Sequence, residues 1–230
     1  DSADVTSGTM NFTTTGLPLN HNFILSVDGN SDAISAFQCN FDESWNYCGN
    51  GTDGSCAPSQ RTTNCNNANV NVSGSTMEIC FSPQGNCLSR LNGSATHTSG
   101  FTGTCASNPC ATGEICADYT YNNDGVEEAR HSCDSCDSTG TLSAAASTRQ
   151  ALSVFFFTDA CVRSAILNSS APLNYCLWDA LGSKNAYSQD EGMCANGANC
   201  YIEDWPGKNH YKVGVFDNSL LIGSMNWSNN

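Results

Sequence analysis

Short apolar runs separated by polar, glycine-rich segments recur along the chain and predict an alternation of strands and helices. Helices are expected at 33–45, where apolar residues recur at helical spacing, and at 159–167, with a turn or short helix at 85–91. Strands are expected at 22–27, 77–81, 152–157, 175–178, 200–203, 211–216 and 220–224. The run 152–157 is apolar enough for a strand buried on both faces. This pattern favours an α/β fold in which helices flank a mixed or parallel sheet.

Two segments interrupt the alternation, and both are rich in cysteine and small polar residues. The first, 48–75, is expected to be a loop at least as far as residue 71. The second, 96–147, contains CASNPCATGEIC and CDSC and is interpreted as a disulfide-stapled insertion. The remaining stretches, 1–47, 76–95 and 148–230, are then the parts that build the main fold.

The cysteine content indicates an oxidising compartment. Fifteen cysteines in 230 residues are typical of secreted or lumenal proteins, and their odd number requires a free thiol, an interchain bridge or a partner elsewhere. No apolar run approaches a membrane span, and the first residues lack the pattern of a signal peptide, so we expect a mature or partial chain. Six Asn-x-Ser/Thr sequons add the expectation of N-linked glycans: Asn50, Asn71, Asn92 and Asn168 are glycosylation candidates, and Asn11 and Asn226 lie within the repeat described below.

The charge balance limits the partners. The chain has 22 acidic residues against 8 Lys and Arg, a formal net charge of −14. Such a surface repels nucleic acid backbones and anionic membranes, so no long duplex nucleic acid is expected as a partner. The cations are too scattered in the sequence to predict a basic groove, although a local one is compatible with the composition.

One repeat links the two ends of the chain. The six residues from Gly8 (GTMNFT) match the six from Gly223 (GSMNWS), 215 positions later. An aspartate precedes both copies, since Asp1 lies seven residues before Gly8 and Asp217 lies six residues before Gly223. The chain is therefore expected to begin inside one copy of a motif and to end after a second, which makes 1–47 the end of a first half and 148–230 most of a second.

The second copy carries the candidate chemistry. If 211–216 is a strand that extends back by one residue, His210 and Lys212 share one face of it, because side chains alternate. Ser224 and Asn226 would share a face of the next strand. An imidazole, an ammonium, a hydroxyl and an amide in one small volume suit a phosphodiester, for which they supply a nucleophile or acid, a fixed cation and neutral donors.

This arrangement resembles the His-x-Lys…Asp…Gly-Ser-x-Asn signature of the phospholipase D superfamily, with one residue fewer between Asp217 and Gly223 than is usual. The resemblance implies a metal-independent, two-step displacement through a phosphohistidine, with no cofactor. It makes His210 the nucleophile or the acid, gives Lys212 and Asn226 the phosphoryl oxygens, and lets Ser224 assist. Asp217 resembles an orienting residue.

The resemblance also implies a second histidine from the first motif copy. Of that copy Asp1, Thr9 and Asn11 are present, without a His-x-Lys. Three explanations stay open: preceding residues carry it, a homo-oligomer pairs two copies of the chain, or the chain is an inactive relative. A His-x-Lys five residues before Asp1 would restore the two-motif site. The other three histidines, His21, His97 and His131, lie outside the motif and are expected to be surface residues.

Two rival functions remain at this point. A structural glycoprotein of an extracellular assembly or filament would use the same fold, with the odd cysteine as a link between subunits. A carbohydrate- or protein-binding module could be centred on the 96–147 insertion. For Cys133 and Cys136 we expect disulfides rather than zinc, and no metal site is expected elsewhere. Phe155, Phe156 and Phe157 are expected to pack in the core.

Overall fold

The computed structural model describes residues 4–10, 13, 16, 19–47, 65, 67–81, 86–123, 126–183, 188–194, 198–203 and 206–228. Contacts within the chain divide it into two compact units. One comprises residues 1–7 and 24–87, and the other comprises residues 8–23 and 88–230. The fold is α/β, with several β-sheets, the largest of them mixed, and few helices.

The smaller unit is built from a strand pair, a helix and a hairpin. Strands β1 (Asp4–Gly8) and β2 (Ile24–Asp28) pair, α1 runs over Ser31–Tyr47, and β3 (Asn67–Val72) pairs with β4 (Ser75–Cys80). Val27, Ala33, Val70 and Ile79 form its core. The expected loop through residue 71 was wrong at its end, because the alternation of apolar and polar residues over NANVNV forms β3.

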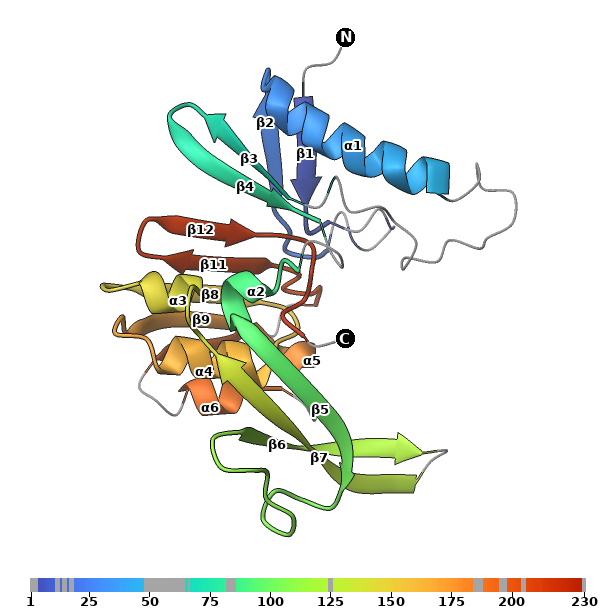
Figure 1. Ribbon diagram of the computed structural model, residues 1–230, viewed down its shortest axis with the longest axis vertical. Helices are drawn as coiled ribbons and strands as arrows, with labels where there is room; N and C mark the ends of the chain where they lie inside the picture. Colours follow the sequence, from blue (N-terminus) through green and yellow to red (C-terminus); the bar gives the residue numbers. More distant parts are fainter. Residues whose placement is uncertain are drawn as a thin grey trace. The chain divides into compact units, whose positions relative to one another are not determined.

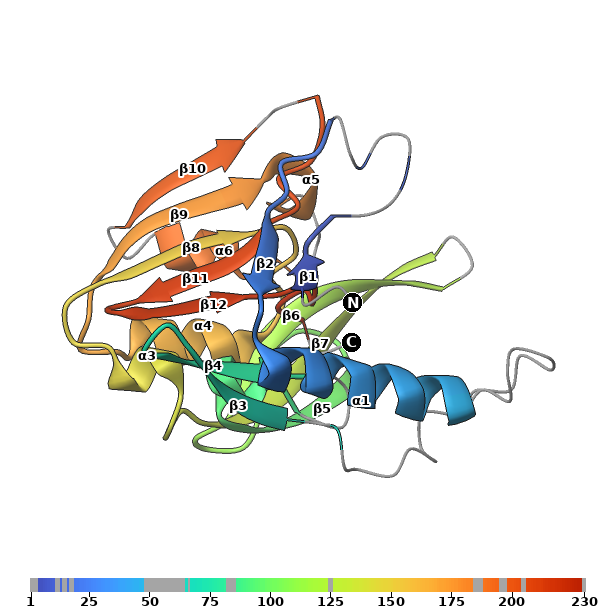
Figure 2. The same cartoon turned by 90° about the horizontal axis from the view of Figure 1, so that it is seen from above.

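The larger unit contains a five-stranded sheet in the order β10-β9-β8-β11-β12 (Figure 2). Strands β8 (Gln150–Val154), β9 (Leu173–Asp179) and β10 (Asn199–Glu203) are parallel to one another. Strand β11 (Lys212–Phe216) is antiparallel to β8 and to β12 (Ser219–Ile222). The expected mixed sheet is confirmed. Because β11 runs opposite to β8 and β9, its first residue lies at the sheet edge where those two strands end.

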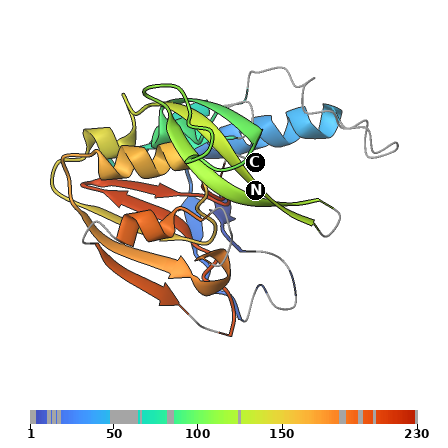
Figure 3. The ribbon, with the colours of Figure 1, turned by 90° about the horizontal axis from the view of Figure 1, so that it is seen from below.

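One face of this sheet holds the main core. Leu152, Cys176, Trp178 and Phe216 pack there against residues of α2 (Ser89–Asn92), α4 (Ala160–Leu167) and α6 (Asp190–Cys194). Figures 1 and 3 show α4 and α6 on the same side of the sheet. Two further short helices, α3 (Leu142–Ala145) and α5 (Ala180–Ser183), lie before β8 and after β9. Strand β8 alternates between buried and half-buried residues, so the expectation of a strand buried on both faces was wrong.

The cysteine-rich insertion is a three-stranded antiparallel sheet in the order β5-β7-β6. Its strands are β5 (Ser94–Thr102), β6 (Ile115–Asn123) and β7 (Val126–Asp137). Two disulfides, Cys105–Cys116 and Cys110–Cys133, fix the loop between β5 and β6 onto the sheet. A third, Cys136–Cys161, ties β7 to α4 and thereby to the main core.

The described residues contain six disulfides, and the remaining three are Cys39–Cys65, Cys80–Cys87 and Cys194–Cys200. Cys176 is a free thiol, 1% exposed, and burial raises its pKa to about 12. This cysteine cannot link subunits, because it lies within the core. Cys48 and Cys56 lie outside the described residues. Within the described part of the chain, no helix has the length and apolar character of a membrane span.

The glycosylation candidates differ in their surroundings. Asn71 and Asn168 are exposed, and Asn50 lies outside the described residues. Asn92 is 7% exposed, and its Nδ2 donates a hydrogen bond to Asp159 Oδ2 at 3.0 Å. The Asn92 side chain is thus packed and hydrogen-bonded, in contrast to the exposed Asn71 and Asn168.

Two residues of β9 provide a test of which sheet face holds the core. Trp178 is 2% exposed and stacks on Phe157 with ring centroids 5.6 Å apart, whereas Tyr175 is 59% exposed. We expect Trp178→Ala to lower the free energy of unfolding by about 3–5 kcal/mol. Tyr175→Ala should change it by no more than about 0.5 kcal/mol. Urea unfolding of both variants measures the difference, and similar losses would contradict this packing.

Candidate active site

The His210 to Lys212 segment lies at the sheet edge where β8 and β9 end. In the register of the sheet Lys212 is opposite Val154, and Val154 is opposite Trp178. His210 precedes β11, so the expected strand over both residues was too long by two positions. The main chain before β11 is held by the segment around His21: His210 N donates to His21 O at 3.0 Å, and His21 N donates to Lys208 O at 2.8 Å.

The His210 ring meets the remnant of the first motif copy. Its Nδ1 lies 2.5 Å from the carbonyl oxygen of Thr9, a residue 201 positions away in the sequence. Since a carbonyl only accepts, Nδ1 carries the proton and donates it, which leaves the Nε2 lone pair available. Thr9 is 2% exposed and is itself held by a hydrogen bond from its N to Phe23 O at 3.2 Å. A residue of the first motif copy therefore contacts His210, which belongs to the second copy.

The electrostatic environment keeps His210 neutral. Burial lowers the pKa of its imidazole below 6.5, and the charge of Lys212 lowers it further, while the hydrogen bond to Thr9 acts in the opposite direction. A neutral imidazole with a fixed Nδ1 proton presents Nε2 as a nucleophile or as a base.

Lys212 is a buried cation. Its side chain is 1% exposed, and its Nζ donates to His210 O at 3.0 Å. Burial lowers the pKa of this ammonium to about 8, although the negative charge of Asp179 acts to raise it. Both a carbonyl acceptor and a carboxylate thus support a charge that the core would otherwise disfavour.

The ring of Phe155 lies close to two lysines and to His210. Phe155 directly follows β8, and its centroid lies 5.2 Å from Lys212 Nζ, 5.4 Å from Lys208 Nζ and 5.1 Å from the centroid of the His210 ring. Cations are attracted to the face of an aromatic ring at such distances. The expectation that Phe155 only packs in the core was therefore incomplete. Two of the eight Lys and Arg residues gather on this ring, which gives an acidic protein a locally cationic site.

Asp179 and Asn209 brace the site from the end of β9. The Oδ1 atom of Asp179 accepts hydrogen bonds from Leu181 N at 2.8 Å and Gly182 N at 3.1 Å, which fixes the start of α5. Its Oδ2 accepts from Asn209 N at 2.8 Å, next to His210. Both residues are almost fully buried. Neither residue was predicted from the sequence, although an aspartate at the end of an apolar strand could have indicated a polar site there.

Ser224 and Asn226 lie beyond β12, which ends at Ile222, so the expectation of a strand carrying both was wrong. Ser224 is exposed. Asn226 Oδ1 is buried and has no hydrogen-bond partner among the residues that the structure describes. The segment is positioned beside the site by Gly223 N, which donates to Lys212 O at 3.3 Å, and by Trp227 N, which donates to Phe156 O at 3.1 Å.

The carboxylate of Asp217 binds the loop that precedes β8. Asp217 lies in the turn between β11 and β12 with φ of 50°. Its Oδ1 accepts from Thr148 N, Thr148 Oγ1 and Arg149 N, and its Oδ2 accepts from Ser147 N and Ser147 Oγ, at 2.6–3.1 Å. The hydroxyl of Thr148, followed by the backbone N–H groups, holds the pKa of this carboxyl far below 3.8.

The other three histidines each have a partner other than His210 or Lys212. Asp1 and Asn11 lie outside the described residues. His21 Nδ1 pairs with Glu203 Oε1 at 2.5 Å, His97 Nδ1 pairs with the buried Asp134, and His131 Nδ1 donates to Gly103 O at 3.0 Å. His131 is 1% exposed, so the expectation of a surface residue was wrong for it. In these 230 residues His210 is the one histidine within the motif.

No protein-family model matches the sequence, and no curated protein matches it. A similar solved structure is that of a phospholipase D family member, Nuc from Salmonella typhimurium, with 21% identity and a TM-score of 0.33. The similarity covers 38% of this chain and 62% of that one, so this chain spans less than two thirds of that protein.

The Asp217 contacts predict a pH-dependent contribution to stability. A carboxyl whose pKa is lowered by folding stabilises the protein above its unfolded pKa and loses this contribution as the pH falls through the folded value. We expect Asp217→Asn to lower the free energy of unfolding at pH 6, and the difference from the natural protein should shrink below pH 3.8. Urea unfolding at several pH values measures it, with Asn218→Ala, an exposed neighbour, as the control. A loss that is equal at every pH would contradict the role of the charge.

Proposed function

We propose that this chain carries one half of a phosphodiesterase site of the phospholipase D type, in which His210 is the nucleophile. The observation that supports the proposal best is the hydrogen bond from His210 Nδ1 to Thr9 O, 2.5 Å long, beside a buried lysine. It joins Thr9 of the first motif copy to His210 of the second and leaves the Nε2 lone pair available for attack. A solvated surface histidine would have none of these constraints.

The proposed reaction has two displacements. The lone pair of His210 Nε2 attacks phosphorus, the bond from phosphorus to the leaving oxygen breaks, and a protonated second imidazole gives its proton to that oxygen. Water then attacks phosphorus, gives a proton to the second imidazole, and the bond between phosphorus and Nε2 breaks. His210 returns to its neutral form, with Nδ1 still donating to Thr9.

The phosphate would be held by groups that are already in place. Lys212 supplies a cation beside His210, and Lys208 adds a second one over the same Phe155 ring. Asn226, whose Oδ1 lacks a partner among the described residues, is the amide placed next to this segment. Rotation of that amide would let Nδ2 donate to a phosphoryl oxygen, as required for a trigonal-bipyramidal phosphorus whose charge grows on its equatorial oxygens.

The second imidazole is proposed to come from outside these four histidines. The backbone around His21 contacts His210, but the ring of His21 pairs with Glu203. In the β-bridge His21 is opposite Asn209 rather than His210. Adjacent residues of an extended chain point to opposite faces, so the His21 ring is directed away from the His210 ring. His97 and His131 belong to the insertion. The first motif copy, whose Thr9 already contacts His210, is the place from which a partner would approach.

The charge distribution favours a substrate recognised through one phosphate. A net charge of −14 opposes a long polyanion, whereas Lys208 and Lys212 can neutralise a single phosphodiester. A lipid phosphodiester or the phosphodiester of a short nucleic acid would meet this condition. The disulfides fit an extracellular or lumenal location, which is part of the proposal.

Substitution of His210 tests the proposal. With the protein in its full natural length, hydrolysis of bis-p-nitrophenyl phosphate should fall at least about a thousandfold in His210→Ala, because the nucleophile is lost. His21→Ala removes a neighbouring imidazole that faces away and should retain most of the activity. Release of nitrophenol measures both. Equal activities of the two variants, or no hydrolysis by the natural protein, would contradict the proposal and favour the structural-subunit function.

The pH profile of the same reaction tests the role of Lys212. Its pKa of about 8 predicts that kcat/KM falls as the pH rises through 8, since the ammonium loses its charge. The lowered pKa of His210 keeps the nucleophile neutral to a lower pH than an ordinary imidazole, so the acid limb of the profile should lie below its usual position. Lys212→Arg should move the alkaline limb upward, because a guanidinium stays charged. If the alkaline limb stays near pH 8 in Lys212→Arg, it reports another group, and the role proposed for Lys212 is wrong.

A further inference from the structure

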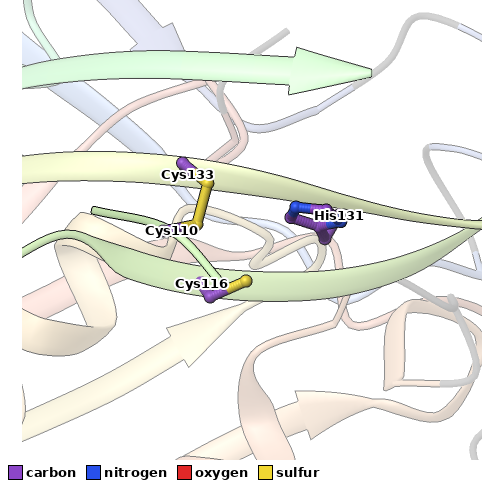
Figure 4. Close-up of side chains that lie close together, drawn as sticks. All are labelled: Cys110, Cys116, His131 and Cys133. Carbon is purple, nitrogen blue, oxygen red and sulfur yellow. A yellow bond between two sulfur atoms is a disulfide. The ribbon is translucent and has the colours of Figure 1, made fainter. Parts of the chain in front are cut away.

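The insertion contains a second cluster of reactive side chains, which the proposed phosphodiesterase does not use. Cys110, Cys116, Cys133 and His131 place their ligand atoms within 4.8 Å of one another. Figure 4 shows the Cys110–Cys133 disulfide beside Cys116 and the His131 ring. Cys116 is bonded to Cys105, whose sulfur is not part of this group of four.

The sheet register explains why these residues converge. Cys116 on β6 lies directly opposite Cys133 on β7, so their side chains share one sheet face. His131 precedes Cys133 by two positions and shares that face as well. Cys110 comes from the loop between β5 and β6 and reaches the same point, with its sulfur 3.5 Å from Ser132 O. Three separate segments thus bring four potential ligands, three cysteines and one histidine, to one place.

His131 is oriented as a metal ligand would be. It is 1% exposed, and Phe101 stacks on its ring at 5.2 Å. Its Nδ1 donates to Gly103 O at 3.0 Å, which fixes the tautomer and leaves the lone pair on Nε2. Metal-bound histidines commonly have their second nitrogen fixed in this way by a backbone carbonyl.

The space around the cluster is sufficient for an ion. A cavity of about 240 Å³ is lined by Cys110, Cys133, His131, Phe101 and Glu114, among others. In a tetrahedral zinc site with bonds of about 2.3 Å to sulfur, the ligand atoms lie about 3.8 Å apart. The present spread of up to 4.8 Å is close to this, and the cavity lets the bonded sulfurs separate.

We propose that the insertion is a redox-controlled zinc site, in which Cys110, Cys116, Cys133 and His131 bind Zn²⁺ when a dithiol has reduced the two disulfides. Zinc would then cross-link the same loop and strands that the disulfides cross-link in the oxidised protein. The fold of the insertion would be preserved in both states, and an oxidant would release the metal.

Conversion of the two disulfides into the zinc site requires two dithiols as the reductant. Each disulfide takes two electrons and two protons from one dithiol, which becomes a cyclic disulfide, so two dithiols yield four thiols. Binding of Zn²⁺ then displaces the protons of Cys110, Cys116 and Cys133, and the neutral His131 binds through Nε2. The site carries one net negative charge, and Cys105 remains as a free thiol.

Protection from alkylation tests the assignment on the whole protein. The chain is reduced anaerobically with dithiothreitol, with or without Zn²⁺, treated with iodoacetamide, and digested for mass spectrometry. With zinc, Cys110, Cys116 and Cys133 should be alkylated at least about tenfold more slowly than without it, whereas Cys105 should be alkylated at the same rate. Absence of protection, or equal protection of Cys105, would overturn the proposal.

Matched histidine variants provide the second measurement. In the reduced protein, Co²⁺ should give the absorption of a tetrahedral thiolate complex, and His131→Ala should weaken its binding about 10–100-fold. His97→Ala is the control, since His97 belongs to the same sheet but pairs with Asp134 outside the cluster. Equal binding by the two variants would remove His131 from the site and contradict the proposal.

Discussion

The burial of the Lys212 ammonium is the constraint on which the candidate site depends. A charge with 1% exposure is costly in a protein interior unless its environment compensates for lost water. Here the compensation comes from three elements: the His210 carbonyl before β11, the Phe155 ring after β8 and the Asp179 carboxylate at the end of β9. They meet because β11 runs antiparallel to β8, which is parallel to β9. The strand order of the sheet therefore determines the position of the charge.

The same arrangement fixes the imidazole. Because the chain before β11 is bonded to the segment around His21, the ring of His210 can reach only a limited set of partners, and it meets the carbonyl of Thr9. Lys212 in turn lowers the pKa of His210 through its charge. A neutral imidazole beside a cation is the combination that the proposed reaction requires, because the cation would attract an anionic phosphodiester while the ring stays nucleophilic.

Local patterns in the sequence predicted the five strands of the main sheet in the larger unit and α4, whereas the three strands of the insertion were not predicted. The apolar run that forms β8 and continues to Phe157 is a strong signal, because burial depends on neighbouring residues. The site was predicted in part: His210 and Lys212 followed from their spacing, whereas Phe155, Asp179 and Asn209 did not. These three come from strand ends far apart in the sequence, and only the register of the sheet brings them together. The exact ends of β11 and β12 also depended on tertiary contacts, which is why His210, Ser224 and Asn226 lie outside the strands.

The central claim is that Nε2 of His210 forms a bond to phosphorus. Rapid mixing of the full-length protein with excess bis-p-nitrophenyl phosphate, an alkaline quench that preserves phosphohistidine, and peptide mass spectrometry test this directly. The account predicts a phosphoryl adduct on the peptide that contains His210 and at that residue. An adduct on another residue, or hydrolysis that proceeds with no covalent adduct at any time after mixing, would contradict it.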